Sequence, residues 1–412
     1  MSTAPAQAST AQVITLGSAQ TLAYASSLYL PAVLAQPMAA SLGLAPAMVF
    51  AAFSLAVVVS AGVGPAAGRW VDRHGGRPVL MATNGLFALG LVALAGVQGP
   101  LSLLAAWVLI GLAMGSGLYE AAFATLVRLY GPGARRGITG ITLIAGFAST
   151  VGWPLSAWME TLWGWRGACL GWAALHLLLG LPLNASLPRA TGTAAPGPTP
   201  APASTSASAT ATPAPPAASP AARRNMLLLS LVFAVFSFVG TSMAMHLPQL
   251  LQALGLGLAA AVAASALVGP AQVAGRLMEL GFLHRVHPLL SARLAALTHP
   301  LGALLLLTAG GPSTLAFVFA LLHGAGNGII TITKGTLPLA LFGAQGYGAR
   351  QGWLMLPTRV AAAAAPVLFG LVIDRIGAAA LWLSTGLGLL AFAALMGLQP
   401  PQPTADPQSR HG

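Results

Sequence analysis

Three ionisable side chains lie inside long apolar stretches, where this sequence otherwise avoids charge. Glu120 lies in the stretch 101–127, Lys334 (the only lysine of the chain) in 313–336, and Arg359 in 352–373. Because burying a charge in an apolar environment is expensive, ionisable residues in such places are candidates for function. A carboxyl group there can carry a proton, and a cation without a carboxylate partner can hold an anion.

The composition indicates what surrounds these side chains. Of the 412 residues, 56% are hydrophobic and only 6% are charged, and the mean hydropathy is +0.80, whereas a soluble domain carries about 25% charged residues. Apolar runs of about twenty residues recur, each long enough to cross a hydrocarbon core of about 30 Å. The sequence therefore predicts an all-α membrane protein with the lipid bilayer as a partner.

Twelve transmembrane helices are expected, in two halves of six. The predicted spans are 13–35, 46–67, 78–97, 101–127, 138–160, 167–187, 226–247, 258–280, 289–309, 313–336, 352–373 and 378–397. Residues 191–222 consist almost entirely of Ala, Pro, Ser, Thr and Gly, which favours a disordered linker. We therefore expect a first half at 1–187, a cytoplasmic linker at 188–225, a second half at 226–397 and a tail at 398–412.

The basic residues predict the orientation. With the N-terminus inside, most of the eighteen Lys and Arg residues fall in cytoplasmic loops, as the positive-inside rule requires. We expect both termini in the cytoplasm and the protein in the cytoplasmic (inner) membrane. The net charge of +12 is dispersed along the chain and does not form a basic stripe, so no nucleic acid is expected as a partner.

The two halves resemble each other at three places. The segment VGPAAGRWVD (63–72) is similar to VGPAQVAGRLME (268–279), and Gly115-Ser-Gly117 is similar to Gly326-Asn-Gly328. The loop GPGARRG (131–137) matches GYGARQG (346–352). Matches spaced six spans apart favour parallel repeats related by an axis along the membrane normal.

The segment GRWVDRHGGR, between the second and third spans, resembles the signature of the major facilitator superfamily of secondary transporters. The residues that carry the resemblance are Gly68, Asp72, Arg73, Gly75 and Arg77. A weaker copy is formed by Gly275, Arg276 and Glu279, six spans later. With the twelve spans and the long central loop, the resemblance covers nearly the whole chain.

The resemblance implies alternating access, in which two halves rock about a central cavity, and a cytoplasmic gate at the signature. Asp72 would face the N-terminus of the eleventh span, where a carboxylate gains about 0.3–1 kcal/mol, with Arg73 and Arg77 completing a charge network. Gly68 would allow close approach of neighbouring helix backbones. The alternative is that these charges only anchor the loop in the cytoplasm.

A near copy of the signature lies at Gly370–Gly377. Because the eleventh span exits on the outside, we interpret Asp374 and Arg375 as external charges. Glu160 and Arg166, at the end of the fifth span, are interpreted in the same way. They serve either as interfacial anchors or as an external gate.

The family resemblance places the fourth and tenth spans at the central cavity, so we expect Glu120 and Lys334 to face each other across it. Glu120 is then a proton carrier, or the two residues form a structural ion pair. Arg359 cannot lose its charge and needs an anion, either a protein carboxylate or a substrate. The alternative is that Arg359 reaches the interface or a backbone carbonyl.

Other chemistry receives little support from the sequence. We expect His246, His299 and His323 to be packing residues, and no spacing indicates a metal or cofactor. Neither a nucleophile–base arrangement nor the phosphate-binding G-x4-G-K-[S/T] motif occurs, so an enzyme or an ATP-driven pump is not expected. Cys169 is the only cysteine, which excludes an intramolecular disulfide.

We therefore expect a monomeric secondary transporter whose partners are a small-molecule substrate and protons. A small organic anion, coupled to protons or exchange, is the first candidate. The alternative is a proton-coupled drug or metabolite efflux pump, although Gly146–Pro154 matches the exporter motif of the fifth span only loosely. A non-transporting membrane receptor is the third candidate, which the intact gate motif disfavours.

Overall fold

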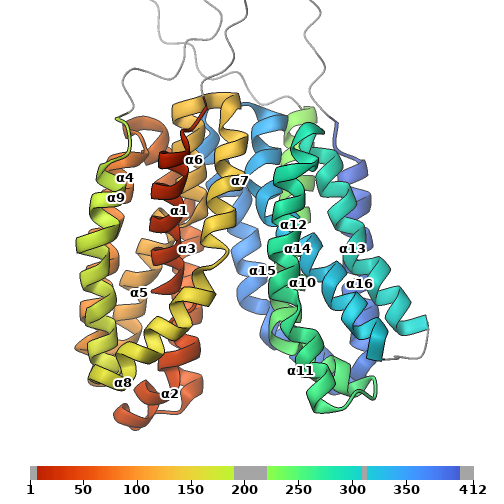
Figure 1. The fold of residues 1–412 in the computed structure, drawn as a ribbon, viewed down its shortest axis with the longest axis horizontal. Coiled ribbons are helices and arrows are strands. Elements are labelled where there is room, and N and C mark those ends of the chain that lie inside the picture. Colours follow the sequence, from red (N-terminus) through yellow and green to blue (C-terminus); the bar gives the residue numbers. More distant parts are fainter. Residues whose placement is uncertain (1–6, 190–219, 309–312, 400–412) are drawn as a thin grey trace, which may run out of the picture.

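The computed structural model describes residues 7–189, 220–308 and 313–399, and within these ranges it contains helices and no strands (Figure 1). The first half contains α1 (Thr10–Ala25), α2 (Pro31–Leu42), α3 (Pro46–His74), α4 (Gly76–Ala95), α5 (Pro100–Gly117), α6 (Tyr119–Tyr130), α7 (Ala134–Ala145), α8 (Ala148–Leu175) and α9 (Leu181–Ala185). The second half contains α10 (Pro220–Ala253), α11 (Leu258–Ala266), α12 (Val268–Gly281), α13 (Pro288–Thr308), α14 (Ser313–Phe342), α15 (Tyr347–Ile376) and α16 (Ala380–Met396).

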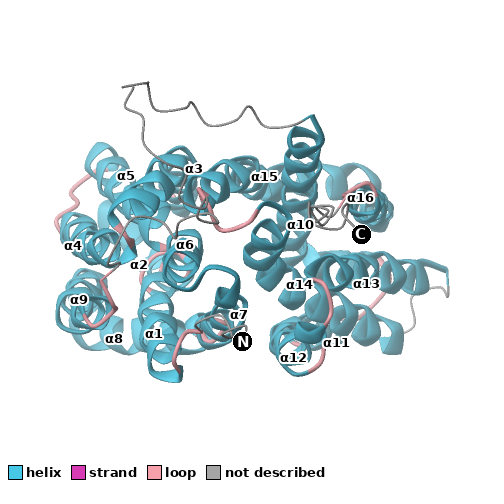
Figure 2. Ribbon diagram, turned by 90° about the horizontal axis from the view of Figure 1, so that it is seen from above, coloured by secondary structure: helices cyan, strands magenta, loops and turns pink. Residues whose placement is uncertain are grey.

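Each half packs around its own apolar core. Phe87, Trp107 and Trp172 are fully buried in the first half, and Phe319 and Phe369 are fully buried in the second. The halves are joined mainly by two contacts, α3 against α15 and α7 against α12 and α14, which lie on opposite edges of the interface in Figure 2.

The two halves meet most closely at one end of the bundle. We call the end at which α9 ends and α10 begins the linker end, which is uppermost in Figure 1. An apolar cluster at this end contains residues of both halves, among them Val71, Ile138, Leu339 and Tyr347. The halves are therefore packed tightly against each other at the linker end.

Eight helical stretches of the described residues are long and apolar enough to cross a membrane, by length and composition. Two of them are merged, because 100–185 and 347–396 each include several predicted spans. The first predicted span is divided into α1 and α2. Gly164, with φ 67° inside α8, marks the bend at which the fifth and sixth predicted spans meet.

Three further spans are interrupted in the middle. The fourth is divided at Leu118, the fifth at Gly146 and Phe147, and the eighth at Leu267. Inside a membrane, irregular backbone is tolerated only where protein or a water-filled cavity satisfies its polar groups. The interruptions in the fourth and fifth spans therefore mark candidate positions for a polar site.

The predicted linker at 188–225 is partly wrong, because α10 begins at Pro220. Proline is favoured at the first position of a helix, since its missing N–H would have no partner there. The added turn is held to the residues that follow α16 by Arg224, which donates to the carbonyl of Gly397, and by Asn225, which donates to that of Gln399. Residues 190–219 of the predicted linker and residues 400–412 of the predicted tail lie outside the described residues.

Candidate functional site

The carboxylate of Asp72 joins the two halves at the linker end. Its two oxygens accept hydrogen bonds from the backbone N–H groups of Gly348 and Ala349, each at 2.9 Å. These N–H groups belong to the first turn of α15, which has no partners for them within the helix. Asp72 thus satisfies two donors and places a negative charge at the positive end of the helix dipole.

A glycine pair on each helix permits this contact. A Cβ atom at Gly68 would overlap the carbonyl of Gly348, and a Cβ atom at Gly352 would lie 2.5 Å from the carbonyl of Gly64. Gly64 and Gly68 are four residues apart on α3, as Gly348 and Gly352 are on α15. Small residues at this spacing allow helix backbones to approach closely in membranes. Only Gly68 was singled out from the sequence, although the G-x3-G spacing marks all four.

The remaining residues of the signature take separate positions. Gly75 ends α3 with φ 81°, a backbone angle that favours glycine. Arg73 is exposed and Arg77 is partly buried. Neither forms an ion pair within the described residues, so the expected charge network around Asp72 is absent. The reason is that the carboxylate of Asp72 is turned toward α15.

The second copy of the signature forms a different contact. Glu279, which is fully buried on α12, accepts a hydrogen bond from Arg135 at 3.0 Å. Arg135 also donates to the carbonyls of Val286, at 2.7 Å, and Leu283, at 3.1 Å. Gly275 packs against the carbonyl of Ala325 on α14. The Arg135–Glu279 ion pair therefore joins α7 to α12, as Asp72 joins α3 to α15.

Arg276 is not part of that ion pair. Its side chain points across the interface toward the interruption between α7 and α8, where a Cβ atom at Gly146 would overlap Nη1 of Arg276. The residue is 6% exposed, and no hydrogen bond or ion pair of its guanidinium is found within the described residues. Tyr29 and Tyr119 lie close enough to interact with it electrostatically. The structure thus separates Arg276 from the gate copy in which the sequence had placed it.

Glu120 and Arg359 form the other ion pair between the halves. Oε2 of Glu120 lies 2.8 Å from Nη2 of Arg359, and Nη1 of Arg359 donates to the carbonyl of Ser60. Glu120 lies in the first turn of α6, directly after the interruption at Leu118. That interruption therefore positions an acidic side chain at a helix N-terminus deep in the bundle.

Lys334 does not form the direct pair with Glu120 that the sequence suggested. Within the described chain the carboxylate is paired with Arg359, and Lys334 forms no ion pair. Lys334 is partly buried and remains close enough to Glu120 for an electrostatic interaction. The similar Gly-x-Gly segments of the fourth and tenth spans placed Glu120 and Lys334 at similar depth. Arg359 of α15 lies nearer to Glu120 and forms the ion pair instead.

The charged residues at the end of the bundle opposite the linker end form no ion pair within the described residues. Arg166 donates to the carbonyls of Ala95 and Val97, and its guanidinium stacks 4.2 Å from the ring centroid of Trp165. Glu160 and Asp374 have no ion-pair partner in this part of the chain. These contacts resemble interfacial anchoring more than a gate.

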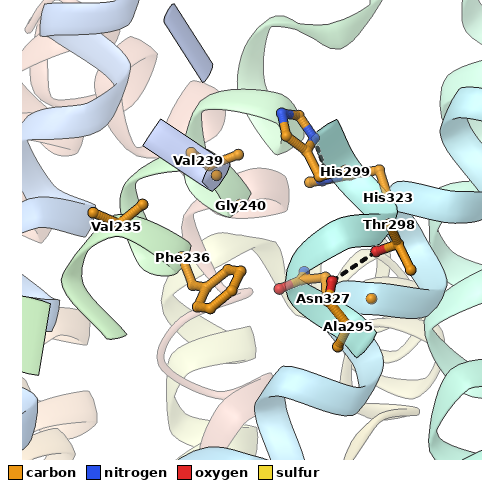
Figure 3. Close-up of a pocket in the computed structure, with 11 residues that line it drawn as sticks. Val235, Phe236, Val239, Gly240, Ala295, Thr298, His299, His323 and Asn327 are labelled. Carbon is orange, nitrogen blue, oxygen red and sulfur yellow. Dashed lines mark hydrogen bonds between the residues drawn. The ribbon is translucent and has the colours of Figure 1, made fainter. Parts of the chain in front are cut away.

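Two of the three singled-out histidines are brought together. Nδ1 of His299 lies 3.0 Å from Nδ1 of His323 (Figure 3), and Nε2 of His299 lies 3.1 Å from Oγ of Ser384. His246 lies apart, 2.9 Å from the carbonyl of Pro366. The spacing of His299 and His323 in the sequence gave no sign of this contact, because they lie on different helices.

A protein-family model and a set of solved structures match this chain. Residues 16–333 match the family model described as Major Facilitator Superfamily. No curated protein is significantly similar in sequence.

Solved structures show similar folds. The human organic anion transporter MFSD10 (TETRAN) has 19% identity and a TM-score of 0.65, and the alignment covers 93% of this chain and 98% of that one. The proton:xylose symporter XylE has 14% identity and a TM-score of 0.67, over 94% and 96%. The fucose transporter FucP in its outward conformation has 14% identity and a TM-score of 0.68, over 94% and 99%.

Proposed function

Because the chain belongs to the Major Facilitator Superfamily, we propose that it moves a small organic anion by alternating access, coupled to protons or to exchange. Its fold is that of a multi-pass secondary transporter, as the sequence predicted. The proposal concerns the substrate, its coupling, and the residues that carry them.

An excess of cations over carboxylates between the halves carries the proposal. Arg359, Lys334 and Arg276 project into this region, and Glu120 is their carboxylate, held by Arg359. Burying a cation without a partner costs several kcal/mol (roughly), so a site with two such cations is stabilised by a negatively charged occupant. A substrate carboxylate would supply the missing charge.

The contacts at the linker end support a conformation closed on that side. Asp72 with α15 and Arg135 with Glu279 hold the halves together at two opposite edges. In our proposal this end faces the cytoplasm, because most basic loops lie there. The anion would then enter from the outer side, and both contacts would break before its release.

Glu120 is the proposed proton carrier. Protonation would neutralise its carboxylate and weaken its contact with Arg359, which would leave Arg359 available to the substrate anion. This links proton binding to anion binding through one ion pair.

A panel of organic anions and neutral analogues in proteoliposomes tests the proposal. We expect Arg359→Ala and Arg276→Gln to reduce anion transport about tenfold or more, because a hydrogen bond to a charged group contributes about 1.5–3 kcal/mol. Glu120→Gln should retain exchange and lose accumulation driven by a pH gradient. Arg375→Gln, at the opposite end of α15, is the control and should resemble wild type.

Two outcomes would contradict the proposal. If Arg359→Ala transports every anion as wild type does, Arg359 is not part of an anion site. If Glu120→Gln keeps full accumulation driven by a pH gradient, Glu120 is not the proton carrier. Equal transport of neutral analogues and anions by wild type would favour an efflux pump with an apolar cavity.

A further inference from the structure

A small cavity adjoins the His299–His323 pair inside the second half. Its volume is about 20 Å³, enough for one water molecule. The lining includes Phe236 and Gly240 of α10, Thr298 of α13 and Asn327 of α14, together with both histidines (Figure 3). The two rings are 6% and 4% exposed.

Hydrogen-bond accounting assigns the protons of the neutral pair. The hydroxyl of Ser384 donates to the carbonyl of Leu381 at 2.9 Å, so its oxygen is free to accept from Nε2 of His299. A neutral imidazole carries one N–H, which leaves Nδ1 of His299 as an acceptor. Nδ1 of His323 must then donate to it across 3.0 Å.

This assignment leaves Nε2 of His323 as a free base. It has no hydrogen-bond partner within the described residues, and His323 lines the cavity. Two neighbouring groups can hold a water molecule there. Thr298 donates its hydroxyl proton to the carbonyl of Ala295 and keeps its lone pairs, and the side-chain amide of Asn327 makes no bond within the described chain.

Neither ring takes part in an ion pair within the described residues. His299 lies on α13 and His323 on α14, and the helices in contact with these two are α6, α7, α10, α11, α12, α15 and α16. Outside the pair, α11 and α16 carry no ionisable side chain, and the others carry Tyr119, Glu120, Arg128 and Tyr130 (α6), Arg135 and Arg136 (α7), Arg223, Arg224 and His246 (α10), Arg276 and Glu279 (α12), Arg293 (α13), Lys334 (α14), and Tyr347, Arg350, Arg359, Asp374 and Arg375 (α15). The pair therefore responds to proton supply through the cavity rather than to a neighbouring salt bridge.

We propose that the His299–His323 pair is a proton-binding site, filled from the cavity at Nε2 of His323. A hydronium ion of the solvent supplies the proton: one of its O–H bonds breaks, an N–H bond forms at Nε2 of His323, and a neutral water molecule is left. The resulting imidazolium donates from Nδ1 to His299 and from Nε2 to the cavity water. A role in transport rests on the proposed function, but proton binding itself does not.

His176 is a matched control in the first half. It is fully buried, yet both its ring nitrogens have partners, Ser26 at 2.7 Å and Asn84 at 2.9 Å. It therefore presents no free base, and its ring should stay neutral over a pH range in which His323 titrates.

The test is a nitrogen-15 NMR titration of histidine-labelled protein in lipid nanodiscs, from about pH 8 to about pH 4, which brackets the ordinary histidine value of about 6.5. His323→Gln, His299→Gln and His176→Gln assign the signals, and gel filtration checks their folding. We expect one buried imidazole to become doubly protonated and its signal to be absent from His323→Gln. A His323 signal that stays neutral throughout, or that titrates no earlier than His176, overturns the proposal.

Transport measurements distinguish a failure of this proton-binding site from a failure of the proposed function. One pH unit supports about a tenfold accumulation ratio for each coupled proton, so His323→Gln should lower accumulation about tenfold and leave counterflow unchanged. If His323 titrates in wild type that shows no gradient-driven accumulation, the proton site stands and the proposed coupling fails. If His323→Gln accumulates substrate like wild type, the site has no part in coupling.

Discussion

The carboxylate of Asp72 lies 2.9 Å from the backbone nitrogen of Gly348, a residue 276 positions later in the other half of the molecule. Together with the neighbouring bond to Ala349, this contact connects the end of α3 to the start of α15.

Replacing Asp72 with Asn should slow turnover while substrate affinity remains measurable. The amide keeps one acceptor but loses the charge at the helix N-terminus, a loss of about 1–2 kcal/mol, so the closed state should be populated about five- to thirtyfold less. Turnover and affinity in proteoliposomes measure this. Asp374→Asn, in the similar segment at the opposite end, is the control. Unchanged turnover would leave Asp72 as a loop anchor.

Gly68→Ala should open the linker end. The added methyl group would overlap the backbone of Gly348, which cannot move aside like a side chain, and overpacking costs about 1–3 kcal/mol. Spin labels at His74 and Arg285, in a Cys169→Ser background, report the separation of the halves. Gly62→Ala, on the same helix with no atom within 4 Å, should show the wild-type separation. Identical distance distributions for both variants would contradict a close-packing role.

Arg135→Gln should destabilise the protein more than Arg136→Gln. Loss of Arg135 leaves the fully buried Glu279 unpaired, and breaking a buried ion pair from one side costs about 3–5 kcal/mol. The double variant Arg135→Gln with Glu279→Gln should recover part of the loss. Thermal unfolding in detergent measures both arginine variants, Glu279→Gln and the double variant, and additive losses in the double variant would show that the pair is not coupled.

Lysine at position 359 should not support transport as arginine does. The guanidinium contacts Glu120 and the carbonyl of Ser60 through different nitrogens, and a lysine ammonium has no such fork. We expect transport to fall about tenfold, since a charge-assisted hydrogen bond contributes about 1.5–3 kcal/mol. Wild-type turnover in Arg359→Lys would show that only the charge matters there. Arg375→Lys is the control.

Stability should fall as the pH drops through the titration of His287, in the loop between α12 and α13. Desolvation, and then the charges of Arg135 and Arg293, lower its pKa below the ordinary value. Below about pH 6.5 the unfolded chain binds this proton more readily than the folded chain, so stability present above that pH is lost. Melting temperatures of wild type and His287→Gln at high and low pH measure this. His287→Gln should lose less than wild type, whereas His74→Gln should lose the same amount as wild type.

Local patterns predicted the fold class because membrane helices are specified by local composition. About twenty apolar residues suffice for one span, and each span satisfies its own backbone. The same information misplaced the start of α10, since Ala-rich sequence beside Pro220 does not distinguish a helix from a linker.

The candidate site depends on side-chain contacts between residues that are far apart in the sequence. The repeat between the halves suggested Arg276 as a gate residue, but the partner of Glu279 came from α7, and Arg276 turned toward Gly146. The aligned glycines also suggested that Lys334 would meet Glu120. A sequence repeat shows which positions of the two halves are equivalent. It does not show that a side chain from another helix lies closer to one of them than its equivalent does.

The sequence by itself determined the helical membrane fold and the superfamily, and it singled out the few intramembrane charges as candidates. Apolar length and motif spacing are local properties of the chain, so they can be recognised without coordinates. Only the tertiary structure decided that Glu120 holds Arg359, that Arg276 and Lys334 lack ion-pair partners within the described residues, and that His299 meets His323. Each of these contacts joins different helices, and packing alone sets which faces of those helices meet.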